Sequence, residues 1–164
     1  MSVSASLCIE DHENPLEPRG QTLLGNLLRD YLLFLLHPFA RRQKLGMLIG
    51  GQNYDFQGNI YAPDVSFIGV QKLHLLDWEK PVQRFAPDLA IDIPSPTDLY
   101  RDVLARKHRY LDSGTSDVWL ISTITREIAL YNRNRIIRGS DDLSTPLIPG
   151  FSITVDKLFD EAEA

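Results

Sequence analysis

The chain has 164 residues, 43% hydrophobic and 24% charged, a composition that suits one globular domain with a substantial core. Its net charge of −5 means that a basic surface for nucleic acid has to be local rather than global. The lone Cys8 excludes an internal disulfide, and the four histidines lack zinc-site spacing. We expect a cytoplasmic protein, because we find no signal peptide and no apolar stretch long enough to span a bilayer.

The N-terminal part predicts a loose segment followed by a helix. Residues 1–20 combine charges and prolines without periodicity, which indicates a weakly ordered segment before a domain that spans 21–164. Residues 21–36 carry a broad leucine stripe at helical spacing, and His37-Pro38 is expected to end this helix. The stripe either packs on a sheet or covers part of a second subunit, and from the second alternative we expect a homodimer.

The rest of the chain alternates strands with one further long helix. We predict strands over 45–49 and 62–68, an irregular excursion over 69–87, a strand over 88–93, a helix over 99–113, a strand over 117–122, a hairpin from 127–131 and 135–138, a strand over 152–155 and a short helix over 156–161. This order indicates the α/β class, with a mixed central sheet flanked by helices in a single domain.

The strand over 88–93 places an acidic side chain among apolar ones. Asp92 is flanked by Ile91 and Ile93, and it alternates with the apolar face of the strand. Burying an unpaired carboxylate is expensive, so Asp92 needs a partner. Asp88 is on the same face four residues earlier, about 13 Å along a strand, so one metal ion cannot bind both. We interpret Asp88 as either a turn carboxylate or a peripheral member of a site.

The following helix carries one inward lysine. On a helical wheel of about 100° per residue, Lys107 falls in the middle of the apolar arc. The other strongly charged residues of this helix point to the opposite side. Asp92 and Lys107 therefore either neutralise each other as a buried ion pair or act together in chemistry.

Asp64 is a second acidic candidate, on the strand predicted over 62–68. If this strand pairs with the strand of Asp92, the two carboxylates converge as hard oxygen ligands for Mg²⁺. A metal there activates water, and the Lys107 ammonium stabilises the charge of a phosphodiester transition state. The structural alternative is that Asp64 merely begins a strand and Asp92 pairs with Lys107.

The remaining polar residues have simpler interpretations. Ser95 fits a helix N-cap, with Pro96 at the first helical position, and it has no histidine base nearby that would make it a nucleophile. Several arginines line a basic rim or simply face solvent: Arg106, Arg109, Arg133, Arg135 and Arg138.

Several motifs in a fixed order resemble a known family. They are Pro63-Asp64-Val65-Ser66-Phe67-Ile68, Pro87-Asp88-Leu89-Ala90-Ile91-Asp92-Ile93 with Ser95-Pro96, Lys107…Tyr110…Gly114, Val118-Trp119-Leu120 and Pro149-Gly150-Phe151. Over roughly residues 21–159 the chain is similar to the Uma-two family, bacterial endonucleases of the PD-(D/E)xK nuclease superfamily. The resemblance implies a restriction-endonuclease-like fold.

The resemblance also assigns roles to individual residues. Asp64 is similar to the first metal-binding aspartate of the superfamily, and Asp92 to the second acid, where glutamate is usual. The superfamily lysine ordinarily follows two places later, where this chain has Pro94, and the family resemblance places the functional lysine on the next helix, at Lys107. Glu17 is the nearest match to a further acid from the N-terminal region.

The implied activity is Mg²⁺- or Mn²⁺-dependent hydrolysis of DNA phosphodiester bonds. Asp64 and Asp92 bind the metal, Lys107 stabilises the transition state, and Asp88 assists. Two alternatives stay open: a catalytically inactive nuclease-fold protein that binds nucleic acid or a protein partner, and a nuclease that acts on RNA or branched DNA. Fold alone does not decide between them.

Overall fold

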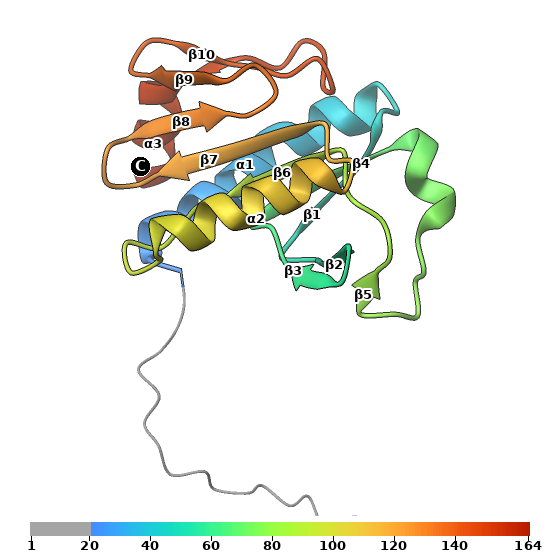
Figure 1. Cartoon of the computed structure of the whole chain (residues 1–164). Coiled ribbons are helices and arrows are strands. Elements are labelled where there is room, and N and C mark those ends of the chain that lie inside the picture. The colour runs from blue at the N-terminus through green and yellow to red at the C-terminus, as the bar shows by residue number, and fades with distance from the viewer. Residues whose placement is uncertain (1–20) are drawn as a thin grey trace, which may run out of the picture.

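The computed structural model describes residues 21–164, and the segment 1–20 with Glu17 lies outside them. At the centre is a six-stranded sheet of order β1-β4-β6-β7-β8-β9 (Figure 1). Its strands are β1 (Gly46–Gly50), β4 (Val65–Gly69), β6 (Leu89–Asp92), β7 (Asp117–Ser122), β8 (Glu127–Leu130) and β9 (Arg135–Arg138). In this sheet β6 and β7 are parallel and the other neighbours antiparallel, so the predicted mixed sheet is confirmed.

Helices flank both faces of the sheet, as predicted for the α/β class. α1 (Leu23–Arg42) and α3 (Val155–Glu163) lie behind the sheet in Figure 1, and α2 (Tyr100–Asp112) lies in front. The strict alternation of β6 separates the two layers, because Leu89 and Ile91 join the core under α1 and α3 while Ala90 joins the core under α2. Asp92 is therefore directed to the α2 layer.

A second, three-stranded sheet was not predicted from the sequence. It consists of β2 (Asn53–Phe56), β3 (Asn59–Tyr61) and β5 (Val82–Gln83), in the order β3-β2-β5. No strand was predicted between residues 50 and 61, because each strand is too short to show a clear alternation. The excursion over 69–87 contains β5 and the 3₁₀ helix η1 (Val70–Leu75), and a small pair, β10 (Asp142–Leu143) and β11 (Ile153–Thr154), precedes α3.

Helix α1 extends beyond the predicted stop at Pro38. Proline removes one helical hydrogen bond, but packing beyond it keeps the chain helical to Arg42. Ala40 is buried, and the ring of Phe39 lies 5.7 Å from that of Phe151. At the other end, the Thr22 hydroxyl accepts from the Gly25 N–H at 3.1 Å and caps the helix.

The leucine stripe of α1 mainly covers the sheet. Leu28, Leu32 and Leu36 have no exposed surface, whereas Leu23 and Phe34 remain 76% and 73% exposed. The first of the two predicted uses of this face is thus confirmed, and the homodimer stays a prediction. No helix within residues 21–164 combines the length and hydrophobicity that a membrane crossing requires.

Helix α2 begins four residues later than an N-cap at Ser95 requires. Its N-cap is Leu99, which provides no side-chain hydrogen bond. Ser95 instead closes a separate turn, in which its N–H donates to Asp98 Oδ2 at 3.0 Å and its carbonyl accepts from the Asp98 N–H. The predicted capping role of Ser95 was therefore wrong, and Leu99 and Tyr100 are exposed rather than part of the buried arc.

Replacing a buried leucine of α1 should destabilise the protein strongly. We expect Leu32→Ala to lower the free energy of unfolding by about 2–5 kcal/mol, because it leaves a cavity beneath the sheet. Urea denaturation measures this change. Leu23→Ala, on the exposed side of the same helix, is the matched control and should change the free energy by less than about 0.5 kcal/mol.

Candidate active site

Asp92 ends β6 and is almost entirely buried against α2. Its carboxylate accepts a hydrogen bond from the Tyr110 hydroxyl, whose oxygen lies 3.1 Å from Oδ2 and 3.3 Å from Oδ1. Arg106 Nε lies 3.5 Å from Oδ2. Tyr110 and Arg106 are four residues apart, so one face of α2 supplies both groups.

The small sheet holds Tyr110 in place. The Phe56 ring of β2 lies 4.5 Å from the Tyr110 ring, and the Tyr61 ring of β3 lies 6.0 Å away, edge-on. Burial, and then the Asp92 carboxylate, raise the pKa of Tyr110, so the hydroxyl remains a hydrogen-bond donor at any physiological pH. The unpredicted sheet is therefore part of the support for Asp92.

The side chain of Asp64 is hydrogen-bonded to the backbone of Ile93, the residue that follows Asp92. Asp64 Oδ2 accepts from the Ile93 N–H at 2.7 Å, and the Gln21 side-chain amide donates to the Ile93 carbonyl. Asp64 precedes β4 rather than lying within a strand as predicted, but the pairing of β4 with β6 still brings it to the end of β6. The expected convergence of the two carboxylates is thus present.

Both carboxylates have raised pKa values. Burial raises the pKa of Asp92 to about 6, an effect that Arg106 opposes and that the charge of Asp64 reinforces. Burial also raises the pKa of Asp64, against the Ile93 hydrogen bond and the more distant charges of Arg29 and Arg106. The pair therefore holds more negative charge than its surroundings compensate.

Lys107 is buried, as the wheel predicted, but it does not contact Asp92. Its Nζ lies 4.1 Å from the centroid of the Tyr131 ring, a cation–π contact. Among residues 21–164, no carboxylate lies within 4.0 Å of Lys107, and Arg106 occupies the place predicted for it. The Asp92–Lys107 ion pair, one of the two alternatives drawn from the sequence, is not formed, and Asp92 pairs with Arg106 instead.

The signal for Arg106 and Tyr110 was present in the sequence. At about 100° per residue, Arg106 lies roughly 40° from Tyr110 on the wheel, whereas Lys107 lies roughly 60° away on the other side. The inward face of α2 is broad enough to contact different strands with its two edges. Grouping Arg106 with a solvated basic rim hid this assignment.

The structure separates Asp88 from the two other acids. Asp88 precedes β6 at the end opposite to Asp92. Its Oδ2 accepts from the Gly69 N–H at 2.7 Å, and its Oδ1 lies 3.0 Å from Lys72 Nζ. These contacts join the end of β4 and the start of η1 to β6, as expected of the turn carboxylate, one of the two predicted roles.

The donor set fits a divalent cation bound in part by water and substrate. Within residues 21–164, no three His, Cys, Asp or Glu side chains form a ready-made metal site, and Glu17 lies outside these residues. Mg²⁺, however, is commonly held by one or two carboxylates, with waters and phosphate oxygens completing its octahedron. Asp64 and Asp92 provide such a pair, and burial raises the pKa of both, so a nearby positive charge would favour their ionised forms.

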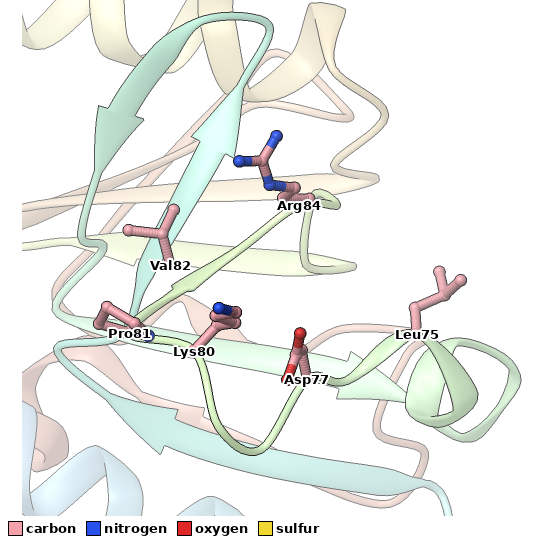
Figure 2. Close-up of a pocket in the computed structure, with 6 residues that line it drawn as sticks. All are labelled: Leu75, Asp77, Lys80, Pro81, Val82 and Arg84. Atoms are coloured by element: carbon pink, nitrogen blue, oxygen red, sulfur yellow. The ribbon is translucent and has the colours of Figure 1, made fainter.

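A separate hollow lies away from the carboxylates. It has a volume of about 420 Å³ and is lined by residues of the excursion before β6 (Figure 2): Leu75, Asp77, Lys80, Pro81, Val82 and Arg84. Its charged lining residues are one carboxylate, Asp77, and two cations, Lys80 and Arg84, so its lining has no second acid to share a metal. We therefore take Asp64 and Asp92, rather than this hollow, as the candidate site.

Comparison with known proteins identifies the family of this chain. The Uma2 family model, described as "Putative restriction endonuclease", matches residues 11–156. The chain belongs to this family. A comparison with curated protein sequences gave no match.

The fold of this Uma2 chain also has a solved counterpart. It is similar to the crystal structure of "a putative nuclease belonging to DUF820 from Anabaena variabilis ATCC 29413", with a TM-score of 0.78 and 16% sequence identity. The match covers 88% of this chain and 84% of the other. At this identity the likeness concerns the fold, a mixed sheet flanked by helices that is shared with a nuclease-fold protein.

Neutralising Asp92 should stabilise the protein most at neutral pH. The native pKa of Asp92 lies above the ordinary value of 3.8, so its protonated form is favoured on folding and this contribution is lost as the pH rises through about 6. We expect the gain in unfolding free energy from Asp92→Asn to be larger at pH 7.5 than at pH 4.5, by about 1–3 kcal/mol. Urea denaturation at both pH values measures this difference.

Asp102→Asn, an exposed carboxylate on the same helix, is the control for general charge effects. A gain from Asp92→Asn that does not change with pH would contradict the raised pKa.

Proposed function

We propose that this chain is a nuclease that hydrolyses phosphodiester bonds with the help of Mg²⁺ or Mn²⁺. The observation that carries the proposal is the convergence of Asp64 and Asp92, both under-compensated in charge, beside the guanidinium of Arg106. Membership of a family described as restriction endonucleases supports the reaction class and suggests DNA as the substrate.

Asp64 and Asp92 are the proposed metal ligands, each held by the protein. The Ile93 N–H fixes Asp64, and the Tyr110 hydroxyl fixes Asp92. When bound, the metal supplies a Lewis acid that activates water and offsets phosphate charge. Fixing both carboxylates before the substrate arrives reduces the reorganisation that catalysis needs.

Arg106 is the proposed transition-state cation. Its 3.5 Å distance from Asp92 is longer than a strong charge-assisted hydrogen bond, and its second partner Asp98 lies 3.6 Å away. The guanidinium is only loosely held by both acids and can turn to a phosphate, which its planar donors match. Lys107, the cation predicted from the sequence, is the alternative for this role.

A catalytically inactive chain is the competing function, favoured by one observation. Arg106 already places positive charge at Asp92 without a metal, as a structural ion pair would. A homodimer remains part of the proposal, with Leu23, Leu27 and Phe34 as exposed apolar candidates for its interface.

A cleavage assay should show whether Arg106 or Lys107 is the catalytic cation. Purified protein is incubated with supercoiled DNA, single-stranded DNA, branched DNA and RNA, in Mg²⁺, in Mn²⁺ and with a chelator. We expect metal-dependent cutting that Asp64→Ala, Asp92→Ala and Arg106→Met each reduce by at least about 100-fold. Lys107→Met should cost only a few-fold, since Lys107 contacts Tyr131 instead.

The pattern of losses decides the assignment. If Lys107→Met abolishes cutting and Arg106→Met does not, the lysine predicted from the sequence is the catalytic cation. If wild type cuts none of the substrates, the inactive alternative is correct.

Metal binding should also be visible without turnover. We expect Mn²⁺ to raise the thermal midpoint of the wild-type protein by a few degrees, because it binds the native state only. Asp64→Ala should lose this shift. Asp88→Ala, whose carboxylate lies at the other end of β6, should keep it even if its own midpoint is lower. An equal shift in both variants would place the metal elsewhere.

A further inference from the structure

A groove beside the proposed active site has no role in the chemistry described above. It has a volume of about 380 Å³ and opens between the start of α2, the turn from β7 to β8, and the front faces of β8 and β9. In Figure 1, α2 lies in front of the sheet, and the strands β8 and β9 lie above α2 in this view. Three large side chains that line it are more than half exposed: Tyr100 (74%), Ile124 (71%) and Ile136 (56%).

The groove is continuous with the site of Asp92. Leu120, on its floor, pairs with Asp92 in the register of β6 and β7, so the two lie on neighbouring strands about 4.8 Å apart. At its rim, Asp98 lies 3.6 Å from an Arg106 nitrogen. A substrate strand with its phosphate at Asp92 therefore has this groove as its immediate neighbour.

The walls of the groove suit a flat aromatic ligand with polar edges. Tyr100 and Tyr131 both line it, Tyr100 from the start of α2 and Tyr131 just after β8. Lys107 lies over one face of the Tyr131 ring and supports it. Hydroxyl groups at the rim offer hydrogen bonds to base edges: Ser95, Ser122, Thr123 and Thr125.

We propose that this groove receives an unpaired nucleobase of the substrate strand, next to the phosphate bound at Asp92. The inference rests on the proposed function and adds to it a substrate class, nucleic acid with at least one unstacked nucleotide at the cleavage site. Bases stack on aromatic side chains irrespective of sequence, but only when they are freed from a duplex. Lys107 then acts as a positioning residue for Tyr131 rather than on the phosphate.

A base fits this groove better than a second copy of the chain does. The cavity has the size and mostly apolar lining of a small-molecule site, with a few polar groups at its edge. Its acids are engaged internally, Asp98 with Arg106 and Glu127 with Arg138. The groove also adjoins the site that a nucleic acid must reach.

Binding of defined oligonucleotides tests the inference apart from cleavage. The probes are a fluorescein-labelled DNA strand, its duplex with the complementary strand, and an abasic strand with the same phosphates, all in Ca²⁺ in place of Mg²⁺. We expect the double variant Tyr100→Ala, Ile136→Ser to bind the single strand about tenfold more weakly than wild type does. Affinity for the duplex and for the abasic strand should be unchanged, because neither offers a free base.

Trp78→Ala is the matched control, since Trp78 is an aromatic residue as exposed as Tyr100 and does not line the groove. It should leave all three affinities unchanged. Thermal midpoints of all variants identify any general loss of folding, which is not expected of residues more than half exposed. The oligomeric state is followed by light scattering.

Equal affinities of wild type and double variant for the single strand would overturn the inference, as would equal weakening toward the abasic strand. A wild-type dimer that the double variant converts to a monomer would show that the groove is a chain–chain interface and would also overturn it. If the groove binds bases as expected but wild type cuts no substrate in Mg²⁺ or Mn²⁺, the proposed nuclease function fails and the groove assignment stands. If wild type cuts and the groove variant binds every probe normally, the groove assignment fails and the proposed nuclease function stands.

Discussion

The buried carboxylate of Asp92 is the constraint on which the arrangement of this molecule depends. Removing an ion from water costs several kcal/mol, even after the surrounding structure has relaxed. Tyr110 and Arg106 offset part of this cost from α2, and the small sheet holds Tyr110 through Phe56. The compensation is incomplete, since the pKa of Asp92 still rises to about 6 with Asp64 nearby. An incompletely compensated acid in a core is a poor stabiliser and a good ligand, which is the arrangement expected of a functional site.

Two adjacent cations on α2 serve different sides of that site. Successive helical residues point about 100° apart, and Arg106 and Lys107 accordingly contact different groups in this structure. Arg106 follows Tyr110 toward β6, and Lys107 faces Tyr131, which follows β8. The proposed phosphate contact of Arg106 and the proposed base contact beside Tyr131 therefore belong to the two edges of one helix. The same division explains why a lysine that is correctly placed inside the fold is not adjacent to Asp92.

The strands of the central sheet could be predicted from the sequence, because their patterns extend over several residues. The ends and caps of helices could not, because they depend on competition between a few local contacts. The buried run over 117–122 and the hairpin after it are present as predicted, and Asp64 and Asp92 do converge, because strand alternation leaves few other arrangements. Helix α1 continues through Pro38 because the packing of Phe39 outweighs one lost hydrogen bond. Ser95 lost its capping role to a turn closed by Asp98. Arg106 was missed because a charged side chain at the edge of an apolar arc resembles a solvated one until its partner is known.

The two acids of the site are not equivalent. Asp64 is only partly buried and receives a backbone N–H, which favours its ionised form, whereas Asp92 is almost wholly enclosed and receives a neutral hydroxyl and a loose guanidinium. A divalent cation at this pair would have to compete with a proton on Asp92, whose pKa is raised to about 6. Metal affinity should therefore fall as the pH drops below about 6. Under the proposed function, Asp64 and Asp92 would hold the cation, and Arg106, no longer needed to offset the charge of Asp92, would be available to a phosphate.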